Sequence, residues 1–422
     1  MKRIRIISAI IIAVMALTSF PASAAQTSSS EAPIPAAKKP TKADKMSIDF
    51  SKIRGFNYTP AGVAQPRHHT DAWVLYNEET ACFDMDLAQK LNLNQARVFV
   101  NYQVYQEIGT DLAPILRHYF RECAKRGISV MPVVGNGEWV RDPSKQDLAE
   151  EWAKFLVNTL KNEPNLSMWD ISNEPDYTFS DERKAMNYKN CEFMSKLFHE
   201  LDPNTPVTIG CATVKGMKDL SEYVDILQFH DYSDTREGIR NTIKEAREFS
   251  EQTGKPVFNG EMGCIARANP YDVTLQEHQE AGMGWYIWEL MIVRKGWGNV
   301  HGVFYEDGTV RDPSIAAAIL GFFRNRDNIR LEEPDAENKI TKALQQIYAW
   351  KADGSMDFDK GIYAAEVAAN LLEAGQLAPM HIAPLYEVNE VRASKDISKL
   401  DALVTKFASM LEPYKKEIVV RK

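Results

Sequence analysis

The sequence predicts an α/β protein, a (β/α)8 TIM barrel over residues 48–325 followed by a C-terminal helical extension over residues 326–422. Short apolar runs alternate with amphipathic helical stretches, the runs are apolar on both faces, and eight of them occur between residues 53 and 288. Strands of this kind, separated by helices, form parallel sheets, and eight units suit a closed barrel. A doubly wound open sheet is the alternative, but no GxGxxG or GxxxxGK(S/T) pattern follows an early strand.

Eight candidate strands follow one another along the barrel region. They are Ile53–Tyr58, Gln95–Val100, Ile128–Val134, Ser167–Ser172, Pro206–Cys211, Val224–His230, Pro256–Met262 and Gly282–Trp288. Helical segments lie between them, among them Asp111–Arg126, Lys145–Asn162, Asp181–Leu201 and Arg236–Thr253. Gly127 and Gly254 follow two of these segments directly, in the position where glycine ends a helix.

The last part of the chain has a different pattern. Helical periodicity recurs at Lys339–Lys351, Gly361–Leu372 and Leu400–Leu411, with few strand signals. The alternating strands and aromatic clusters of a β-sandwich carbohydrate-binding module are missing from this part of the sequence. We therefore expect a small helical appendage, and its sequence assigns it no function.

The N-terminus has the features of a signal peptide over residues 1–24. Three basic residues within the first five precede the apolar run Ile6–Leu17, and Ala22-Ser23-Ala24 supplies small residues for cleavage near Ala24. The apolar run is shorter than the roughly 20 residues that span a bilayer. We expect an exported protein, periplasmic or secreted, whose residues 25–47 form a flexible linker because they are small, polar and rich in proline.

Charge and cysteine content narrow the choice of partners. The net charge is −8, and removal of the three basic residues of the signal peptide takes it to about −11. This acidic excess argues against nucleic acid and anionic membranes as partners, and no later segment suggests a membrane span. The five cysteines form no CxxC pair and are widely spaced, so we expect buried thiols, no metal site and no cofactor.

Two glutamates stand where a barrel enzyme carries its chemistry. Barrel enzymes place catalytic groups at the C-terminal ends of their strands. The fourth candidate strand runs into Asn173-Glu174-Pro175, and the seventh ends in Asn259-Gly260-Glu261. Either glutamate alone is compatible with a solvated loop residue.

Other strand ends add polar and aromatic residues to this pair. Besides Asn173, they are Asn57 in the first strand, Arg97 in the second, His230 with Tyr232 after the sixth and Trp288 at the eighth, while Trp139 follows the third. This set resembles clan A of the retaining glycoside hydrolases, most closely family 5, over residues 50–325. The resemblance implies that Glu174 is the acid/base and Glu261 the nucleophile. Family 5 often carries a histidine after the third strand, whereas this chain has Val134-Gly135-Asn136-Gly137-Glu138-Trp139.

The chemistry explains why such residues belong together. Cleavage with retention needs two carboxyl groups about 5–5.5 Å apart, one protonated and one ionised. Arg97 would favour the ionised form of Glu261, and Tyr232 would donate a hydrogen bond to the same carboxylate. Asn173 would contact the sugar 2-hydroxyl, and Trp288 would lie under the sugar ring.

Each supporting residue also has a purely structural interpretation. Arg97 could belong to a structural ion pair, His230 could be a core histidine, and Tyr232 and Trp288 could be packing aromatics. Glu289 could bind a sugar hydroxyl or be solvated. The adjacent His68 and His69 could reach the cleft but are poor evidence for a metal.

The hypothesis from sequence is a retaining O-glycoside hydrolase with a carbohydrate substrate, for which the resemblance implies a β-mannan or a β-glucan. An exo-acting β-glycosidase on short oligosaccharides is the alternative within enzymes, and a transglycosylase would use the same residues. A carbohydrate-binding barrel without catalysis is the alternative outside enzymes. The oligomeric state is left open.

Overall fold

In a computed structural model of the chain, the residues described are 40–63, 67–135, 145–178, 180–293, 299–323, 336–375, 377–379 and 382–415. The predicted signal peptide, Glu138 and Trp139 lie outside these residues. None of the described helices combines the length and the apolar composition that crossing a membrane requires.

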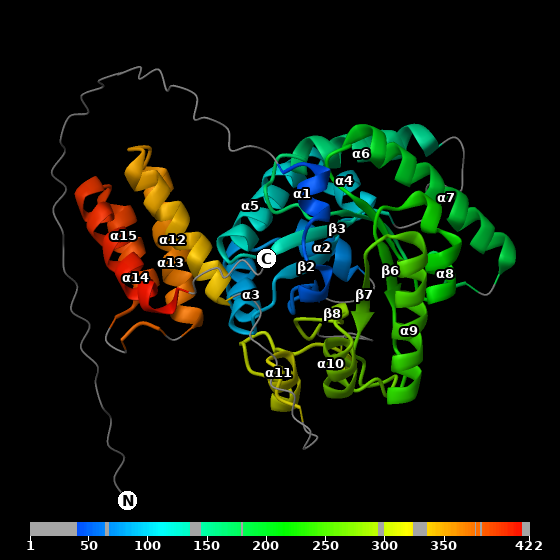
Figure 1. The fold of residues 1–422 in the computed structure, drawn as a ribbon. Coiled ribbons are helices and arrows are strands. Elements are labelled where there is room, and N and C mark those ends of the chain that lie inside the picture. The colour runs from blue at the N-terminus through cyan, green and yellow to red at the C-terminus, as the bar shows by residue number, and fades with distance from the viewer. Residues whose placement is uncertain are drawn as a thin grey trace, which may run out of the picture. The chain divides into compact units, whose positions relative to one another are not determined.

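Eight parallel strands form one sheet in the order β5-β4-β3-β2-β1-β8-β7-β6. A parallel bridge between Cys211 and Phe229 joins the ends of this order, beside β5 and β6, and closes the barrel. The strands lie inside a ring of helices (Figure 1). The prediction of a (β/α)8 barrel is confirmed, and seven of the eight candidate strands contain one observed strand each, while β4 ends one residue past its candidate. The observed strands are β1 (Arg54–Tyr58), β2 (Gln95–Phe99), β3 (Ser129–Val133), β4 (Trp169–Asn173), β5 (Val207–Gly210), β6 (Leu227–His230), β7 (Val257–Met262) and β8 (Gly284–Ile287).

The helices of the barrel begin and end at local signals. Ser180 and Thr235 accept backbone hydrogen bonds at the first turns of α7 and α9, and Gly254 ends α9 in the left-handed conformation at φ 68°. The α-helices of this part of the chain are α2 (His68–Val74), α3 (Glu78–Lys90), α4 (Tyr102–Ile108), α5 (Leu112–Lys125), α6 (Gln146–Leu160), α7 (Asp181–Leu201), α8 (Val214–Asp219), α9 (Arg236–Thr253), α10 (Tyr271–Glu280) and α11 (Pro313–Ile319).

Apolar packing fills the barrel away from the site. The 3-10 helix η1 (Phe50–Lys52) contacts β7 and β8, and Phe50 packs in one buried cluster with Met131, Phe258 and Tyr286. Most of the remaining apolar side chains of the strands belong to the main core, which extends to the surrounding helices. Several of the buried polar side chains, among them Asn57, Arg97 and Glu261, lie in the strands beside this packing.

The predicted flexible linker, residues 25–47, contains a short helix, α1 (Lys42–Met46). The end of the linker is therefore corrected to a position before this helix. Thr41 and Asp44 form a reciprocal capping box at its start. Lys42 pairs with Asp225 at 2.6 Å, and Lys45 donates a hydrogen bond to Thr205 Oγ1 at 2.7 Å. A polar segment without apolar periodicity therefore becomes ordered through its cap and its ion pair, which composition alone does not reveal.

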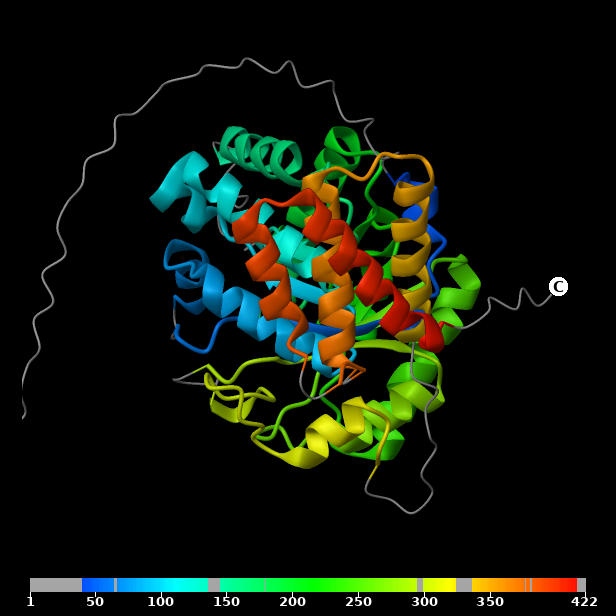
Figure 2. The same cartoon turned by 90° about the vertical axis from the view of Figure 1, so that its left-hand side faces the viewer.

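The C-terminal helices form a bundle with its own core, coloured orange to red in Figure 2. They are α12 (Ala336–Ala352), α13 (Phe358–Ala374), α14 (Pro384–Ser394) and α15 (Ile397–Leu411). Leu344, Ala365, Leu372, Val404 and Phe407 are among the fully buried side chains between them. The helical extension is confirmed, and α14 adds a helix that the periodicity did not indicate.

Candidate active site

The two glutamates meet at the C-terminal end of the barrel. Glu174 directly follows β4, adopts a left-handed backbone at φ 48°, and donates its backbone N–H to the Gly210 carbonyl at 2.6 Å. His230 Nδ1 lies 3.0 Å from Glu174 Oε1 and 3.5 Å from Glu261 Oε2. One carboxylate oxygen of each glutamate and a ring nitrogen of His230 all lie within 4.8 Å of one another. Strands four and seven thus bring together the pair that their sequence positions predicted.

Arg97 organises the polar residues around Glu261. Its fully buried guanidinium donates to Glu261 Oε1 at 2.6 Å, Asn57 Oδ1 at 2.9 Å and Asn173 Oδ1 at 2.8 Å. It also pairs with the buried carboxylate of Asp170 at 2.8 Å. The structural interpretation and the functional one therefore both apply, because one side chain forms a core ion pair and also contacts the candidate nucleophile.

Tyr232 holds the second oxygen of Glu261. Its hydroxyl donates to Glu261 Oε2 at 3.0 Å. The guanidinium of Arg267 lies 4.4 Å from the centre of the Tyr232 ring, in cation–π contact. Sequence reasoning did not find Arg267, because it lies in a loop after β7 and belongs to no motif.

Aromatic rings surround Trp288 at the end of β8. Phe99 meets its indole edge to face at a centroid distance of 5.7 Å, and His301 and His69 approach it similarly at 6.2 and 6.4 Å. His69 also stacks on Phe99 at 4.0 Å, so this histidine reaches the site as the sequence suggested. Burial holds the pKa of His69 well below its ordinary value, which makes it a neutral ring.

Glu289 is buried rather than solvated, with 2 % of its surface exposed. Burial raises the pKa of its carboxyl to about 8, against a hydrogen bond from Thr59 that lowers it, and the charge of Glu261 raises it further. Among the described residues, no group forms a hydrogen bond with its Oε2 atom. A protonated carboxyl group whose Oε2 has no hydrogen-bond partner among the described residues therefore lies within electrostatic range of Glu261.

Burial and His230 have opposing effects on the pKa of each glutamate, and the net shift differs between the two. Burial raises the pKa of Glu261, although the charges of His230 and Arg97 lower it. Burial also raises the pKa of Glu174, but the hydrogen bond and the charge of His230 outweigh that effect and the pKa falls. These directions favour the proton on Glu261, which is the reverse of the roles that strand order implies.

Hydrogen bonds distinguish the two carboxyl groups in the other direction. Arg97 and Tyr232 both donate to Glu261, and both bonds favour its ionised form. These contacts suit Glu261 to the role of an ionised carboxylate.

A metal ion is a poor fit for this group of side chains. Glu174, His230 and Glu261 are residue types that bind metals. The guanidinium of Arg97, however, is permanently charged, lies 2.6 Å from Glu261 and is fully buried, so it cannot turn into solvent to make room for a second cation.

A closed barrel with paired carboxylates at the C-terminal ends of β4 and β7 has the architecture of a glycoside hydrolase. The chain belongs to the family described as Glycosyl hydrolases family 2, TIM barrel domain, whose model matches residues 67–294. This match supports hydrolysis of glycosidic bonds and, with the structures below, confirms the resemblance to clan A. No curated protein sequence matches the chain.

Solved structures of family 5, subfamily 18, glycoside hydrolases share the fold. The Streptomyces cattleya protein in complex with GlcNAc has a TM-score of 0.54 at 16% identity, covering 63% of this chain and 78% of that one. A variant of it in complex with Manβ1-4GlcNAc has a TM-score of 0.54 at 14% identity, covering 71% and 92%. A Bifidobacterium longum variant with the same disaccharide has a TM-score of 0.51 at 14% identity, covering 63% and 76%. At these identities the likeness concerns the fold alone.

Proposed function

We propose that this protein is a retaining β-glycoside hydrolase in which Glu174 is the general acid/base and Glu261 the nucleophile. The observation that carries the proposal is the convergence of both carboxylates on His230 Nδ1, with oxygens within 4.8 Å of one another. Retaining enzymes hold their carboxyl groups about 5–5.5 Å apart, whereas inverting enzymes leave about 6.5–9.5 Å for a water molecule. The short separation supports the retaining mechanism.

The reaction would proceed by two displacements at the anomeric carbon. Glu174 gives its proton to the glycosidic oxygen while Glu261 attacks the anomeric carbon, so the leaving sugar departs and a glycosyl ester forms on Glu261. Glu174 then takes a proton from water, whose oxygen displaces Glu261 from the same carbon. Arg97 and Tyr232 hold Glu261 in one orientation throughout, and Asn173 is available to the sugar 2-hydroxyl.

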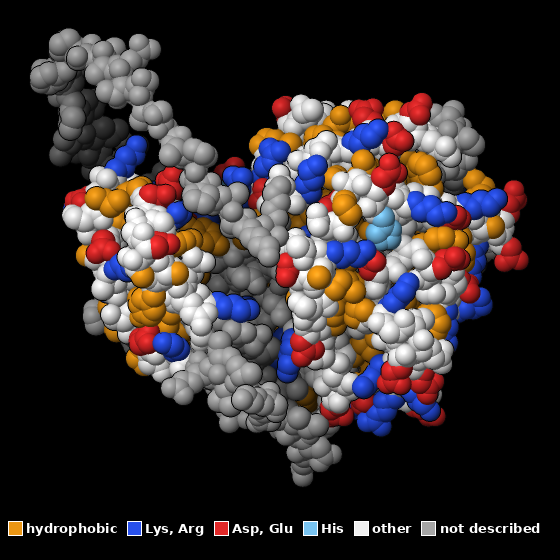
Figure 3. All heavy atoms as spheres, turned by 45° about the horizontal axis from the view of Figure 1, so that its top comes forward, with side chains coloured by type: hydrophobic (Ala, Val, Ile, Leu, Met, Phe, Trp, Pro, Cys, Tyr) orange, Lys and Arg blue, Asp and Glu red, His pale blue; other side chains and the backbone are white. Residues whose placement is uncertain are grey.

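A β-mannoside or β-glucoside of an oligo- or polysaccharide is the proposed substrate, met outside the cytoplasm after export. Two solved structures of similar fold are complexes with Manβ1-4GlcNAc, which supports a β-mannoside as the substrate. The basic and apolar N-terminal segment supports export. Lys and Arg side chains are interspersed with Asp and Glu over the face in Figure 3.

Two substitutions test the assignment of roles. Glu261→Gln removes the nucleophile, so this variant should lose activity on all aryl β-glycosides. Glu174→Gln should lose about 10²–10⁴-fold on substrates with poor leaving groups. It should still release dinitrophenol in a burst, because that leaving group needs no proton. Glu192→Gln, an exposed position on α7 paired with Lys196, is the matched control.

The stereochemistry is read by NMR of the first sugar released. Retention with loss of activity in both variants supports the proposal, whereas an inverted product rejects it. A carbohydrate-binding barrel without catalysis would bind β-glycans in calorimetry and leave every substrate of a mannan, glucan, xylan and galactan panel uncut. The length of the products would separate exo-action from endo-action.

A further inference from the structure

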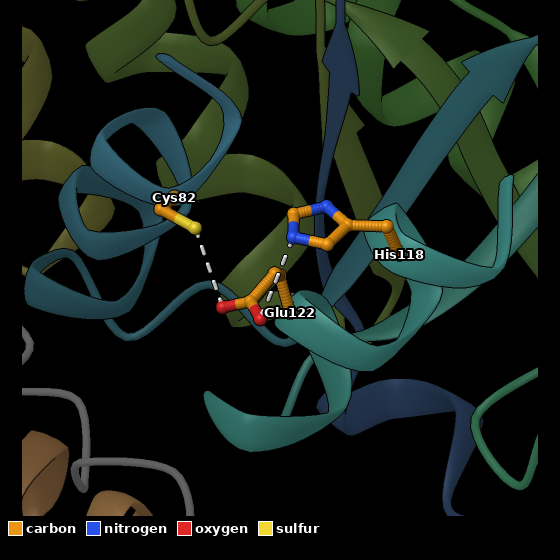
Figure 4. Close-up of side chains that lie close together, drawn as sticks. All are labelled: Cys82, His118 and Glu122. Carbon is orange, nitrogen blue, oxygen red and sulfur yellow. Dashed lines mark hydrogen bonds and ion pairs between the residues drawn. The ribbon is translucent and has the colours of Figure 1, made fainter. Parts of the chain in front are cut away.

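Four side chains of types that bind metals face one another between α3 and α5. They are separate from the residues that contact Glu174 and Glu261. Glu78 and Cys82 lie four residues apart on α3, and His118 and Glu122 lie four residues apart on α5. Side chains at this spacing share one face of a helix. Because α3 and α5 pack together, the two pairs meet in one place. Figure 4 shows three of the four side chains pointing toward one another.

The distances between the ligand atoms suit one small ion. Cys82 Sγ lies 3.3 Å from Glu122 Oε2, and His118 Nε2 lies 3.9 Å from Glu122 Oε1 and 3.6 Å from Glu78 Oε2. Bonds of about 2.0–2.3 Å from a tetrahedral zinc ion place neighbouring ligand atoms roughly 3.3–3.6 Å apart. Small rotations of the side chains would therefore complete the coordination.

Tyr76 prepares the histidine for coordination. Its hydroxyl lies 2.9 Å from His118 Nδ1, the ring nitrogen that faces away from the cluster. When Nδ1–H donates to the Tyr76 oxygen, the lone pair is left on Nε2, which faces the two carboxylates. A histidine ligand held by an outer hydrogen bond is the usual arrangement in protein metal sites.

Two neighbouring cations have other partners and do not exclude a metal. Lys125 and Arg126 each lie 2.9 Å from the Glu122 carboxylate. Arg126 also pairs with Asp86 at 2.6 Å, and Lys125 with Glu366 of α13 at 3.1 Å. If Glu122 turned toward a metal, each cation would keep a carboxylate partner.

We propose that Glu78, Cys82, His118 and Glu122 form a tetrahedral binding site for Zn²⁺ that ties α3 to α5. One sulfur, one imidazole and two carboxylates are ligand types that zinc accepts, and with all four ligands from protein the site is structural rather than catalytic. The 12% exposure of Glu122 and the 27% exposure of His118 leave a path for the ion, and Glu78, at 70%, is free to close over it.

The test uses the full chain, titrated with Zn²⁺ alone against a chromophoric chelator and with Co²⁺ as a spectroscopic probe. We expect one equivalent of Zn²⁺ and, with Co²⁺, a thiolate-to-metal charge-transfer band. Cys82→Ser and His118→Asn should each weaken zinc binding at least about 100-fold, and Tyr76→Phe about 10-fold. His199→Asn, a half-buried histidine on α7 paired with Asp225, is the matched control.

The cobalt band separates this site from the catalytic residues, which include no thiol. If the band survives in Cys82→Ser, or if zinc affinity is the same in Cys82→Ser, His118→Asn and the control, the proposed site is wrong. Failure of the wild-type chain to bind a stoichiometric zinc ion also rejects it. Circular dichroism and thermal unfolding in the presence of a chelator show whether each variant is folded, and the mildest change, Tyr76→Phe, gives a readout if a stronger variant is not.

Discussion

His230 is the residue that lies against both glutamates of the site. Its Nδ1 atom lies between Glu174 and Glu261, and its charge lowers the pKa of both. Arg97 contacts only Glu261 of the two, through a hydrogen bond of 2.6 Å. The permanent cation thus contacts one carboxylate, and the imidazole ring lies against both.

The first prediction concerns the pH dependence of His230→Asn. This change removes the ring charge that lowers the pKa of Glu174, so the carboxyl of Glu174 should keep its proton to higher pH. The alkaline limb of kcat/KM, where the acid is lost, should therefore move to higher pH. Tyr232→Phe, which acts on Glu261, should leave that limb where it is in wild type. An alkaline limb that does not move in His230→Asn would contradict the electrostatic role given to this ring.

Residues at strand ends could be predicted from sequence, whereas their partners could not. Glu174, Glu261 and Arg97 follow from the rule that parallel strands present their C-terminal ends together. Asp170 and Arg267 join the site through contacts with residues tens of positions away, which no local pattern records. The role assigned to Trp139 stays a prediction, because it lies outside the described residues.

The proposed zinc ligands were missed for a related reason. Cysteine spacing predicted no metal site, and a search for CxxC pairs cannot find a site that takes one cysteine and three other ligands from two helices. The signal that could have found them is the pair of four-residue spacings, Glu78 with Cys82 and His118 with Glu122. It becomes informative only once α3 and α5 are known to pack together.

At the scale of elements, β5 must approach the interior of the barrel closely. A Cβ atom at Gly210 would lie 2.7 Å from the Arg97 guanidinium and 3.0 Å from His230 Nε2. Neither side chain can retreat easily, because Arg97 is held by four partners and both are buried. The glycine therefore sets the space in which the site is assembled.

The second prediction is that Gly210→Ala lowers both stability and activity. Overpacking of this kind costs about 1–3 kcal/mol, which urea unfolding would measure as a lower midpoint. Displacement of Arg97 should reduce kcat/KM at the same time. Gly62→Ala is the control, since its nearest neighbour would be Glu306 at 3.9 Å. Equal stability and equal activity of the two variants would show that the site tolerates the methyl group.

The strands could be predicted because each is an apolar run of the right length, and burial on both faces removes the ambiguity of register. Helices α1 and α14 lie in segments where the sequence indicated no helix. Helix α14 is short and only weakly amphipathic, so periodicity does not reveal it. Helix α1 depends on an ion pair with Asp225, which lies in the loop before β6. Tertiary contacts therefore decide the elements that periodicity leaves open.

At the scale of the whole molecule, Glu289 links the stability of the fold to the chemistry of the site. An ordinary glutamate titrates near 4.5, and in the folded protein this one titrates near 8. Between these values the unfolded chain loses a proton that the folded protein keeps. The contribution of the Glu289 carboxyl to the free energy of unfolding is therefore fully present below pH 4.5 and is lost as the pH rises toward 8.

The third prediction follows from that sign. Glu289→Gln has no proton to lose, so it should be more stable than wild type by on the order of 3 kcal/mol at pH 7, at about 1.4 kcal/mol per pKa unit, and close to wild type at pH 4.5. Urea unfolding at the two pH values measures this difference, with Glu237→Gln on the exposed start of α9 as the control.

The kcat/KM of Glu289→Gln should decrease while its stability increases. A buried acid that lowers stability at neutral pH is expected to serve contact with the substrate. If the variant gains no stability at pH 7, Glu289 is not the buried acid described above, and if it gains stability without losing kcat/KM, the acid does not contact the sugar.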